Sequence, residues 1–451
     1  MDFLLKGLMA LPGALAATPV EFFIFGATLL GVALFHHRTL AVALTGLTAT
    51  VIYKLVFTGF TQGPGLAGLM AHAQHEWVLL SNLLLLLLGF ALLANQFERS
   101  NIPDAMPALL PDDWKGGLVL LGMVFVLSIF LDNIAAAIIG GVVARHVYHD
   151  RVSVGFLASI VAASNAGGAG SVIGDTTTTM MWISGVSPVA VLHAFIASIV
   201  AFAVFGLLGA WQQQRHAPIQ AKVAPDAPKV DAARTVIVAL ILITLLAVNF
   251  TGNAWYPEYQ DVAPWLGMGL MTAVLLTALI RAPQWRVLPG AAKGAVFLVS
   301  LVATASLMPV ERLPAAAWQT AMGLGFLSAV FDNIPLTAMA LKQGGYDWGV
   351  LAFAVGFGGS MMWFGSSAGV ALSSLYPQMR SVTAWLRNGW YVPIAYVAGF
   401  VALVSVWGWH PTDTRATAPA GSETHGPPPP MVDAVVQGGA RLWWGLVDRL
   451  P

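Results

Sequence analysis

The chain has 451 residues, of which 57% are hydrophobic and only 9% are charged, whereas soluble domains carry about 25% charged residues. The composition therefore indicates a polytopic membrane protein. Lys plus Arg equals Asp plus Glu and no basic run occurs, so charge gives no indication of a nucleic-acid partner. The absence of cysteine excludes disulfides and thiolate metal sites.

The first part of the chain is expected to cross the membrane three times. Residues 1–20 form an N-terminal segment that fits either a signal peptide or an interfacial helix. Stretches apolar and long enough to span a bilayer follow at 21–35, 39–57 and 77–97. The loop after the first stretch contains Arg38 and the loop after the second contains no Lys or Arg. Positive charge favours the cytoplasm, so the first loop lies inside and the N-terminus outside.

Residues 118–147 are long for one helix and have Asp132 and Asn133 at their middle. A charge at membrane depth is costly and usually functional. We interpret this stretch as a re-entrant hairpin, because both of its ends then return Lys and Arg to the cytoplasm. Residues 152–184 cross outward, but their middle, SNAGGAGSVIGD, is too rich in Gly and polar residues for a continuous helix. Such backbone survives at membrane depth only where it is buried in protein or lines a cavity.

The second part of the chain repeats this plan in the opposite orientation. SIFLDNI at 128–134 returns as SAVFDNI at 328–334, and GGAGSVIGDT at 167–176 returns as GGSMMWFGSS at 358–367. Repeated broken segments of this kind indicate a transporter binding site. After a return span at 188–211, further spans are expected at 235–250, 264–280, 294–308 and 388–409, with a hairpin at 314–344 and a broken helix at 348–377.

The expected fold is an all-α polytopic membrane protein with two inverted-topology repeats, each with a re-entrant hairpin and a broken transmembrane helix, about 10 spans plus 2 hairpins in all. The first repeat covers residues 21–211 and the second 235–409, with a cytoplasmic linker at 212–234. Residues 410–451 are a Pro-rich tail that could end in an amphipathic helix. Both termini are expected outside, in a membrane of the bacterial inner (plasma) type.

The two hairpin tips are candidate ion ligands. An Asp-Asn pair adds a carboxylate and a carboxamide to the unpaired backbone groups of a mid-membrane turn, and hard cations such as Na⁺ prefer such oxygens. The pairs are Asp132-Asn133 and Asp332-Asn333. Alternatively, each Asp only accepts hydrogen bonds from the amides of its own turn. Recurrence of the pair in both halves favours a function.

The two helix breaks supply the remaining candidates. Gly residues permit close approach of a ligand, and Asn, Asp, Thr and Ser provide oxygens. Packing of small residues is the alternative, but it does not account for a buried Asp. The candidates are Asn165, Gly167, Gly168, Asp175 and Thr176 in the first break, where the whole threonine run 176–179 offers oxygens, and Ser366 and Ser367 in the second.

Several other polar residues carry weaker signals. His146 and His149 have the spacing of a metal pair, but no third ligand is near them in sequence, so a solvated patch is favoured. Glu21, Lys54 and His193 lie near expected membrane ends, where such side chains reach the interface or form local hydrogen bonds.

The motifs LDNI, SNAGGAGSVIGDTTTTMMW, FDNIPL and GGSMMWFGSSAGVAL resemble those of the NhaD-type sodium/proton antiporters. This family belongs to the ion transporter superfamily, which also contains citrate, dicarboxylate and arsenite carriers. The resemblance implies a homodimer, elevator-like motion of a transport domain, and Na⁺ bound by Asp132, Asn133, Asp175, Asp332 and Asn333. Ala135, which follows the first tip, departs from the family's hydroxyl residues.

The leading hypothesis is therefore a secondary active transporter that exchanges a cation, sodium in the first place, for protons. Three buried carboxylates suit a site that holds Na⁺ and H⁺ alternately. The runner-up is a sodium-coupled citrate or dicarboxylate carrier, which the lack of Lys and Arg in the core motifs disfavours. An aspartyl protease would require Gly-x-Gly-Asp, and Val172 replaces its first Gly. No enzyme activity and no cofactor are expected; the partners are membrane lipid and a small ion.

Overall fold

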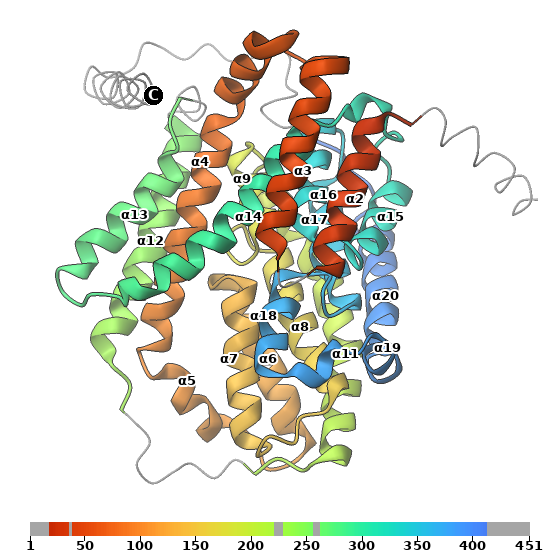
Figure 1. Cartoon of the computed structure of the whole chain (residues 1–451). Helices are drawn as coiled ribbons and strands as arrows, with labels where there is room; N and C mark the ends of the chain where they lie inside the picture. The colour runs from red at the N-terminus through yellow and green to blue at the C-terminus, as the bar shows by residue number, and fades with distance from the viewer. Residues whose placement is uncertain (1–17, 36–37, 221–228, 256–261, 413–451) are drawn as a thin grey trace, which may run out of the picture.

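The computed structural model describes residues 18–35, 38–220, 229–255 and 262–412. Over these ranges the protein is helical, and the only β-type pairing is an isolated bridge between Phe60 and Gly63. Figure 1 shows most of the long helices running roughly along one axis, and their contacts divide them into two groups. The N-terminal segment 1–17 and the tail after 412 lie outside the described residues, as does part of the expected linker.

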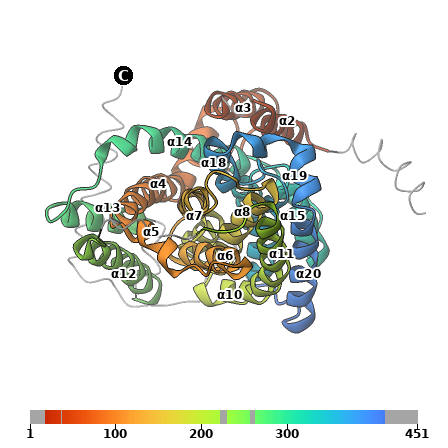
Figure 2. The same ribbon diagram turned by 90° about the horizontal axis from the view of Figure 1, so that it is seen from below.

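The first group, which we call the peripheral group, lies along one edge of the molecule when it is viewed from below (Figure 2). Its helices contact one another in a continuous series, from α2 through α3 and α14 to α4, α13 and α12. They are α2 (Val20–Leu34), α3 (Thr39–Tyr53), α4 (Gly65–Glu98), α12 (Ala232–Trp255), α13 (Trp265–Ala278) and α14 (Leu288–Ser306). Helix α4 begins well before the expected residue 77, so much of the loop predicted at 58–76 is helical.

The second group, which we call the central group, contains the hairpins and the broken helices. Its members are α6 (Trp114–Phe130), α7 (Asn133–Val147), α8 (Val154–Ala169), α9 (Thr176–Ile183), α11 (Ala194–His216), α15 (Trp318–Ser328), α16 (Asn333–Gln343), α17 (Trp348–Gly358), α18 (Ser367–Leu375) and α20 (Tyr391–Val406). Helices α8 and α17 lie at its core, because nearly every residue in them is buried. The short helices α5 (Ile102–Ala105), α10 (Pro188–Leu192) and α19 (Val382–Asn388) join longer elements.

Each predicted hairpin is a pair of helices that turns at its Asp. Helix α6 ends at Phe130 and α7 begins directly after Asp132, while α15 ends at Ser328 and α16 begins directly after Asp332. In Figure 1, α6 and α7 lie in the lower half of the molecule and α15 and α16 in the upper half. The two hairpins therefore approach the middle from opposite ends.

The two hairpins hold the broken helices by matching contacts. The Ser128 hydroxyl donates to the Ser164 carbonyl at 2.5 Å, and the Ser328 hydroxyl donates to the Val355 carbonyl at 2.7 Å. Each hairpin also requires a glycine in the helix that it crosses. A Cβ on Gly167 would lie 2.0 Å from the Phe125 carbonyl oxygen, and one on Gly358 would lie 2.3 Å from that of Gly325. Any larger residue at either position would separate the hairpin from its broken helix.

Five of the described helical segments are long and apolar enough to cross a bilayer, and one bent pair, α19 with α20, adds a sixth. The five segments are Thr39–Thr58, Gly65–Glu98, Pro188–His216, Ala232–Gly252 and Trp285–Ser306. Among the shorter apolar helices, α6, α7, α8 and α17 are hairpin arms or parts of broken helices, as expected, whereas α2 and α13 were expected to be full spans. The protein is thus a helical membrane protein.

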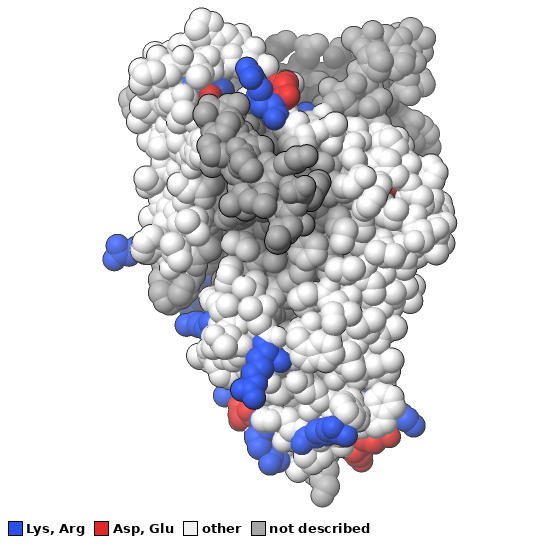
Figure 3. Space-filling view, turned by 90° about the vertical axis from the view of Figure 1, so that its right-hand side faces the viewer, with Lys and Arg blue, Asp and Glu red and all other residues white. Residues whose placement is uncertain are grey.

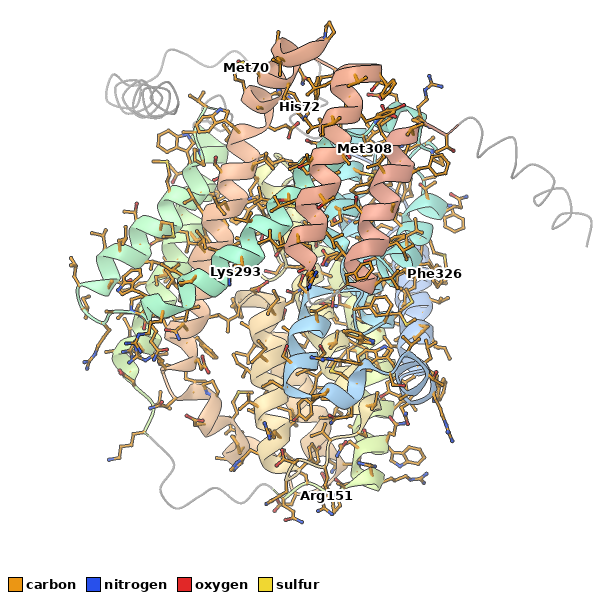
Figure 4. The ribbon with its side chains drawn as sticks, viewed as in Figure 1. Met70, His72, Arg151, Lys293, Met308 and Phe326 are labelled. Atoms are coloured by element: carbon orange, nitrogen blue, oxygen red, sulfur yellow. The ribbon has the colours of Figure 1, made fainter. Side chains whose placement is uncertain are left out.

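Charged side chains are sparse over most of the face seen in Figure 3, and Lys and Arg gather toward its lower end. In Figure 4, Arg151 of the central group lies at the bottom of the molecule, and Lys293 of the peripheral group lies well above it. Both residues are expected at the cytoplasmic surface by the charge pattern. In Figure 1, α7 and α11 of the central group reach lower in the view than α4 and α12 of the peripheral group do.

Candidate functional site

The two tips and the two breaks meet in the middle of the central group, where side-chain hydrogen bonds connect each tip to a break. From the first tip, the Asn133 amide donates to Asn165 Oδ1 at 3.0 Å. The Asn165 amide in turn donates to two hydroxyls of the second break, Ser360 at 2.9 Å and Ser366 at 3.1 Å. Segments far apart in sequence thus form one polar centre.

The second tip enters this centre through Ser367, whose hydroxyl donates to Asp332 Oδ2 at 3.1 Å. The other oxygen of Asp332 accepts the N–H of Ile334 at 3.0 Å and so caps α16. Asp132, at the equivalent position before α7, does not cap its helix with its side chain. The two tips are therefore equivalent in place but not in the use of their carboxylates.

Asp175 lies at the N-terminus of α9, directly after the first break, and is only 1% exposed. Its Oδ1 accepts the N–H of Thr177 at 3.2 Å and lies 3.4 Å from the Asn133 amide nitrogen. Its Oδ2 has no hydrogen-bond partner among the described residues, and neither does the Thr177 hydroxyl. A buried carboxylate oxygen without a donor is costly, so this geometry favours a proton or a cation as its partner.

The threonines that follow Asp175 fix the break by hydrogen bonds and also place hydroxyl groups near the polar centre. Thr178 and Thr179 donate to carbonyls of the break itself, those of Ser171 and Val172, which fixes the non-helical segment against α9. Thr176 is the first residue of α9 and is buried beside the polar centre. The run therefore holds the break in place as well as offering oxygens.

The glycines of the first break are packing residues in this geometry. A Cβ on Gly168 would lie 2.7 Å from the Gly174 carbonyl oxygen, where the chain folds back toward Asp175. Gly167 faces the hairpin, as described above. Both admit close approach of backbone, and neither lies in a hydrogen bond of the centre.

The charges of the centre are all negative. Within the described part of the chain, no Lys or Arg forms an ion pair with Asp132, Asp175 or Asp332. Nor do three or more His, Asp or Glu residues gather there, or elsewhere in the described ranges, to hold a metal ion. A cation bound here would therefore rely on amide and hydroxyl oxygens beside a carboxylate, which are ligands that Na⁺ accepts.

Ser360 belongs to the centre but was not singled out from sequence, and Thr177 was expected only as one of the oxygens of the run 176–179. Thr177 lies inside a run in which any hydroxyl could have faced the site. Ser360 aligns with Ala169 in the repeated motif, so the repeat gave no signal for it. Ser128 and Ser328, in contrast, open the repeated SIFLDNI and SAVFDNI motifs and could have been found there.

No protein-family model matches the chain. It is 27% identical to sodium/proton antiporter 1 of Arabidopsis thaliana over 390 residues, which are 75% of this chain and 64% of the relative. It is 29% identical to sodium/proton antiporter 2 of the same plant, over 56% of this chain and 67% of the relative. The chain thus spans about two thirds of the length of these plant relatives.

Bacterial relatives give a similar result. The chain is 26% identical to the Na⁺/H⁺ antiporter NhaD of Vibrio parahaemolyticus over 381 residues, which are 72% of this chain and 90% of the relative. These matches confirm the resemblance seen in the motifs: the chain is similar to the NhaD-type sodium/proton antiporters.

Proposed function

We propose that the protein is a secondary active transporter that exchanges a cation, sodium in the first place, for protons. The observation that carries this proposal is the buried Asp175 carboxylate with an oxygen that lacks a partner. It lies in a centre without a Lys or Arg ion pair among the described residues. A single carboxylate of this kind can hold either a proton or a cation, but not both. The names of the relatives, all antiporters, support the same activity and give no support to an enzyme.

The ion ligands come from the two tips and the two breaks in this proposal. Na⁺ contacts Asp175 and is surrounded by the tips, Asp132-Asn133 and Asp332-Asn333. The hydrogen-bonded series through Asn165 supports this arrangement, since it already joins the first tip to Ser366 in the second break. Ser366 and Ser367 fix the second break around the ion.

The two halves, residues 21–211 and 235–409, are inverted repeats joined by a cytoplasmic linker. Support comes from the matching Ser128 and Ser328 hydrogen bonds and from the hairpins, which reach the middle from opposite ends in Figure 1. Both termini lie outside a bacterial-type inner membrane. The protein also forms a homodimer in this proposal, which for that feature rests on the resemblance to the NhaD-type antiporters alone.

Transport occurs by an elevator mechanism, in which the central group moves against the peripheral group. The division of the helices into two groups supports this, as does the lower position of Arg151 relative to Lys293 in Figure 4.

Everted membrane vesicles provide the test. A pH gradient is established by respiration, and its dissipation is followed after addition of Na⁺, Li⁺, K⁺ or citrate. We expect Na⁺ to dissipate the gradient in vesicles that contain the protein and not in vesicles that lack it. Dissipation by citrate with Na⁺, but not by Na⁺ alone, would instead establish the carboxylate carrier, which no observation made here favours.

A further inference from the structure

The two broken helices differ at one position that faces the polar centre. In α8, Asn165 precedes Gly167 by two residues, and in α17, Gly356 precedes Gly358 by two residues. Gly167 and Gly358 make the same contact with their hairpins, so Asn165 and Gly356 occupy equivalent places. The Asn165 carboxamide fills its place and bonds to Asn133, Ser360 and Ser366. Gly356 leaves the equivalent place without a side chain.

Two buried oxygen atoms without partners border the place of that absent side chain. A Cβ on Gly356 would lie 3.0 Å from Asp175 Oδ2 and 3.8 Å from Thr177 Oγ1. Neither atom has a hydrogen-bond partner among the described residues. Asp175 is 1% exposed and Thr177 is fully buried.

A third buried atom without a hydrogen-bond partner among the described residues belongs to Asn333. Asn333 begins the second arm of its hairpin, as Asn133 does in the first. The Asn133 amide donates to Asn165, but the equivalent acceptor for Asn333 would be a side chain at position 356. The amide nitrogen of Asn333 is buried and has no partner in the described chain. By the repeat, the missing side chain at position 356 is thus one of the acceptors that Asn333 lacks, while the two atoms from the first break border that position directly.

We propose that the transported cation occupies the place of this missing side chain, and that Gly356 determines which cations fit there. Asp175 Oδ2 and Thr177 Oγ1 face the ion, and Asn333 completes the set by presenting its Oδ1, which exchanges position with Nδ2 when the amide turns over. Asn165 fills the equivalent place in the first half, so each chain has one such cation site. This inference rests on the proposed function and adds to it a specificity-determining residue.

The test is to supply the missing carboxamide. Gly356→Asn reproduces the side chain of the first half and should displace the ion. Binding of Na⁺ and Li⁺ to the purified full-length protein is measured by titration calorimetry, with choline chloride as the blank. We expect Na⁺ affinity to fall by more than about tenfold, while the melting temperature without Na⁺ stays at or above that of the wild type, because the three unpartnered atoms gain partners.

A second variant keeps the test decisive if Gly356→Asn does not fold. Gly356→Ala narrows the place by one methyl group, so Na⁺ should lose more affinity than the smaller Li⁺. Gly323→Ala is the matched control, because a Cβ there meets no atom within 4 Å, and it should leave both affinities unchanged.

The outcomes separate the two proposals. If the wild type binds no Na⁺, the proposed function fails. If the wild type binds Na⁺ and folded Gly356→Asn binds it equally well, the cation lies elsewhere and this inference is overturned. An unchanged ratio of Na⁺ to Li⁺ affinity in Gly356→Ala overturns it as well.

Discussion

Replacing Asp175 with Asn separates charge from shape at the centre of the site. The amide keeps an oxygen in the position of Oδ1, so it can still accept the Thr177 N–H at 3.2 Å and cap α9. The side chain keeps its size, and the packing around it is preserved. What the variant loses is the negative charge and the group that exchanges a proton for a cation.

The loss of Na⁺ affinity expected in Asp175→Asn can be estimated from the surroundings of Asp175. In the described chain, its Oδ1 has one backbone donor and one distant amide, and its Oδ2 has none, so the proposed cation is the main electrostatic partner of this carboxylate. Removing one member of a buried charge pair costs about 3–5 kcal/mol, which is roughly two to three and a half orders of magnitude in affinity. Removal of the titrating group should also eliminate competition between Na⁺ and H⁺.

Calorimetric Na⁺ titrations over roughly pH 6 to 9 would measure both the loss of Na⁺ affinity and the loss of competition by protons. Free carboxylates stay ionised throughout this range, so they do not contribute to the pH dependence. In the wild type, Na⁺ affinity should rise with pH; in Asp175→Asn it should be weak and independent of pH, and antiport in vesicles should stop. Asp150→Asn is the control, since Asp150 is an exposed residue paired with Arg145. A variant that keeps the wild-type pH dependence would show that the coupling proton resides on another group.

Three further predictions concern the tips, the topology and the contact between the helix groups. Ala at Asp132 or at Asp332 should abolish transport, but only Asp332→Ala should also lower thermal stability, by about 1 kcal/mol for the lost helix cap; equal stability losses would favour a structural role for both. Because the chain contains no native cysteine, Asp150→Cys can be labelled alone: an impermeant thiol reagent should react only after permeabilisation, and labelling of intact cells would contradict the single hairpin. Lys342 of α16 donates to the carbonyls of Ser306 and Met308 at the end of α14, both at 2.7 Å. Lys342→Met should therefore release the central group and change the ratio of inward to outward accessibility by about tenfold, measured by the labelling rate of a site cysteine; an unchanged rate would show that these bonds do not hold the groups together.

The sequence predicted the tips and the breaks because each leaves a local signal. A charged residue inside an apolar stretch is rare, and Asp132 and Asp332 recur with the same neighbours. Gly-rich interruptions likewise predicted where α8 and α17 end. The structure places all of these segments around one centre, as the repeat suggested.

Features that depend on partners from distant segments could not be predicted. Gly356 attracts notice only once Asp175 and Thr177 are known to lie beside it, since an absent side chain has no pattern of its own. His193 was expected to bond locally, yet its Nε2 lies 2.7 Å from Asp347 Oδ1, 154 residues away. Burial would raise the pKa of Asp347, but hydrogen bonds from His193 and from the backbone of His410 and Val350 hold that pKa below its usual value.

The unequal depth of the two helix groups in Figure 4 also concerns the lipid around them. Hydrophobic surface at two heights cannot match a flat bilayer of one thickness, so the membrane must thin, thicken or tilt beside one group, at fractions of a kcal/mol per Å of mismatch. In the proposed elevator motion of the central group, this deformation moves or relaxes with that group. The length of the lipid chains then influences the equilibrium between the inward-accessible and outward-accessible states, because the energy of deforming the bilayer contributes to the free-energy difference between them.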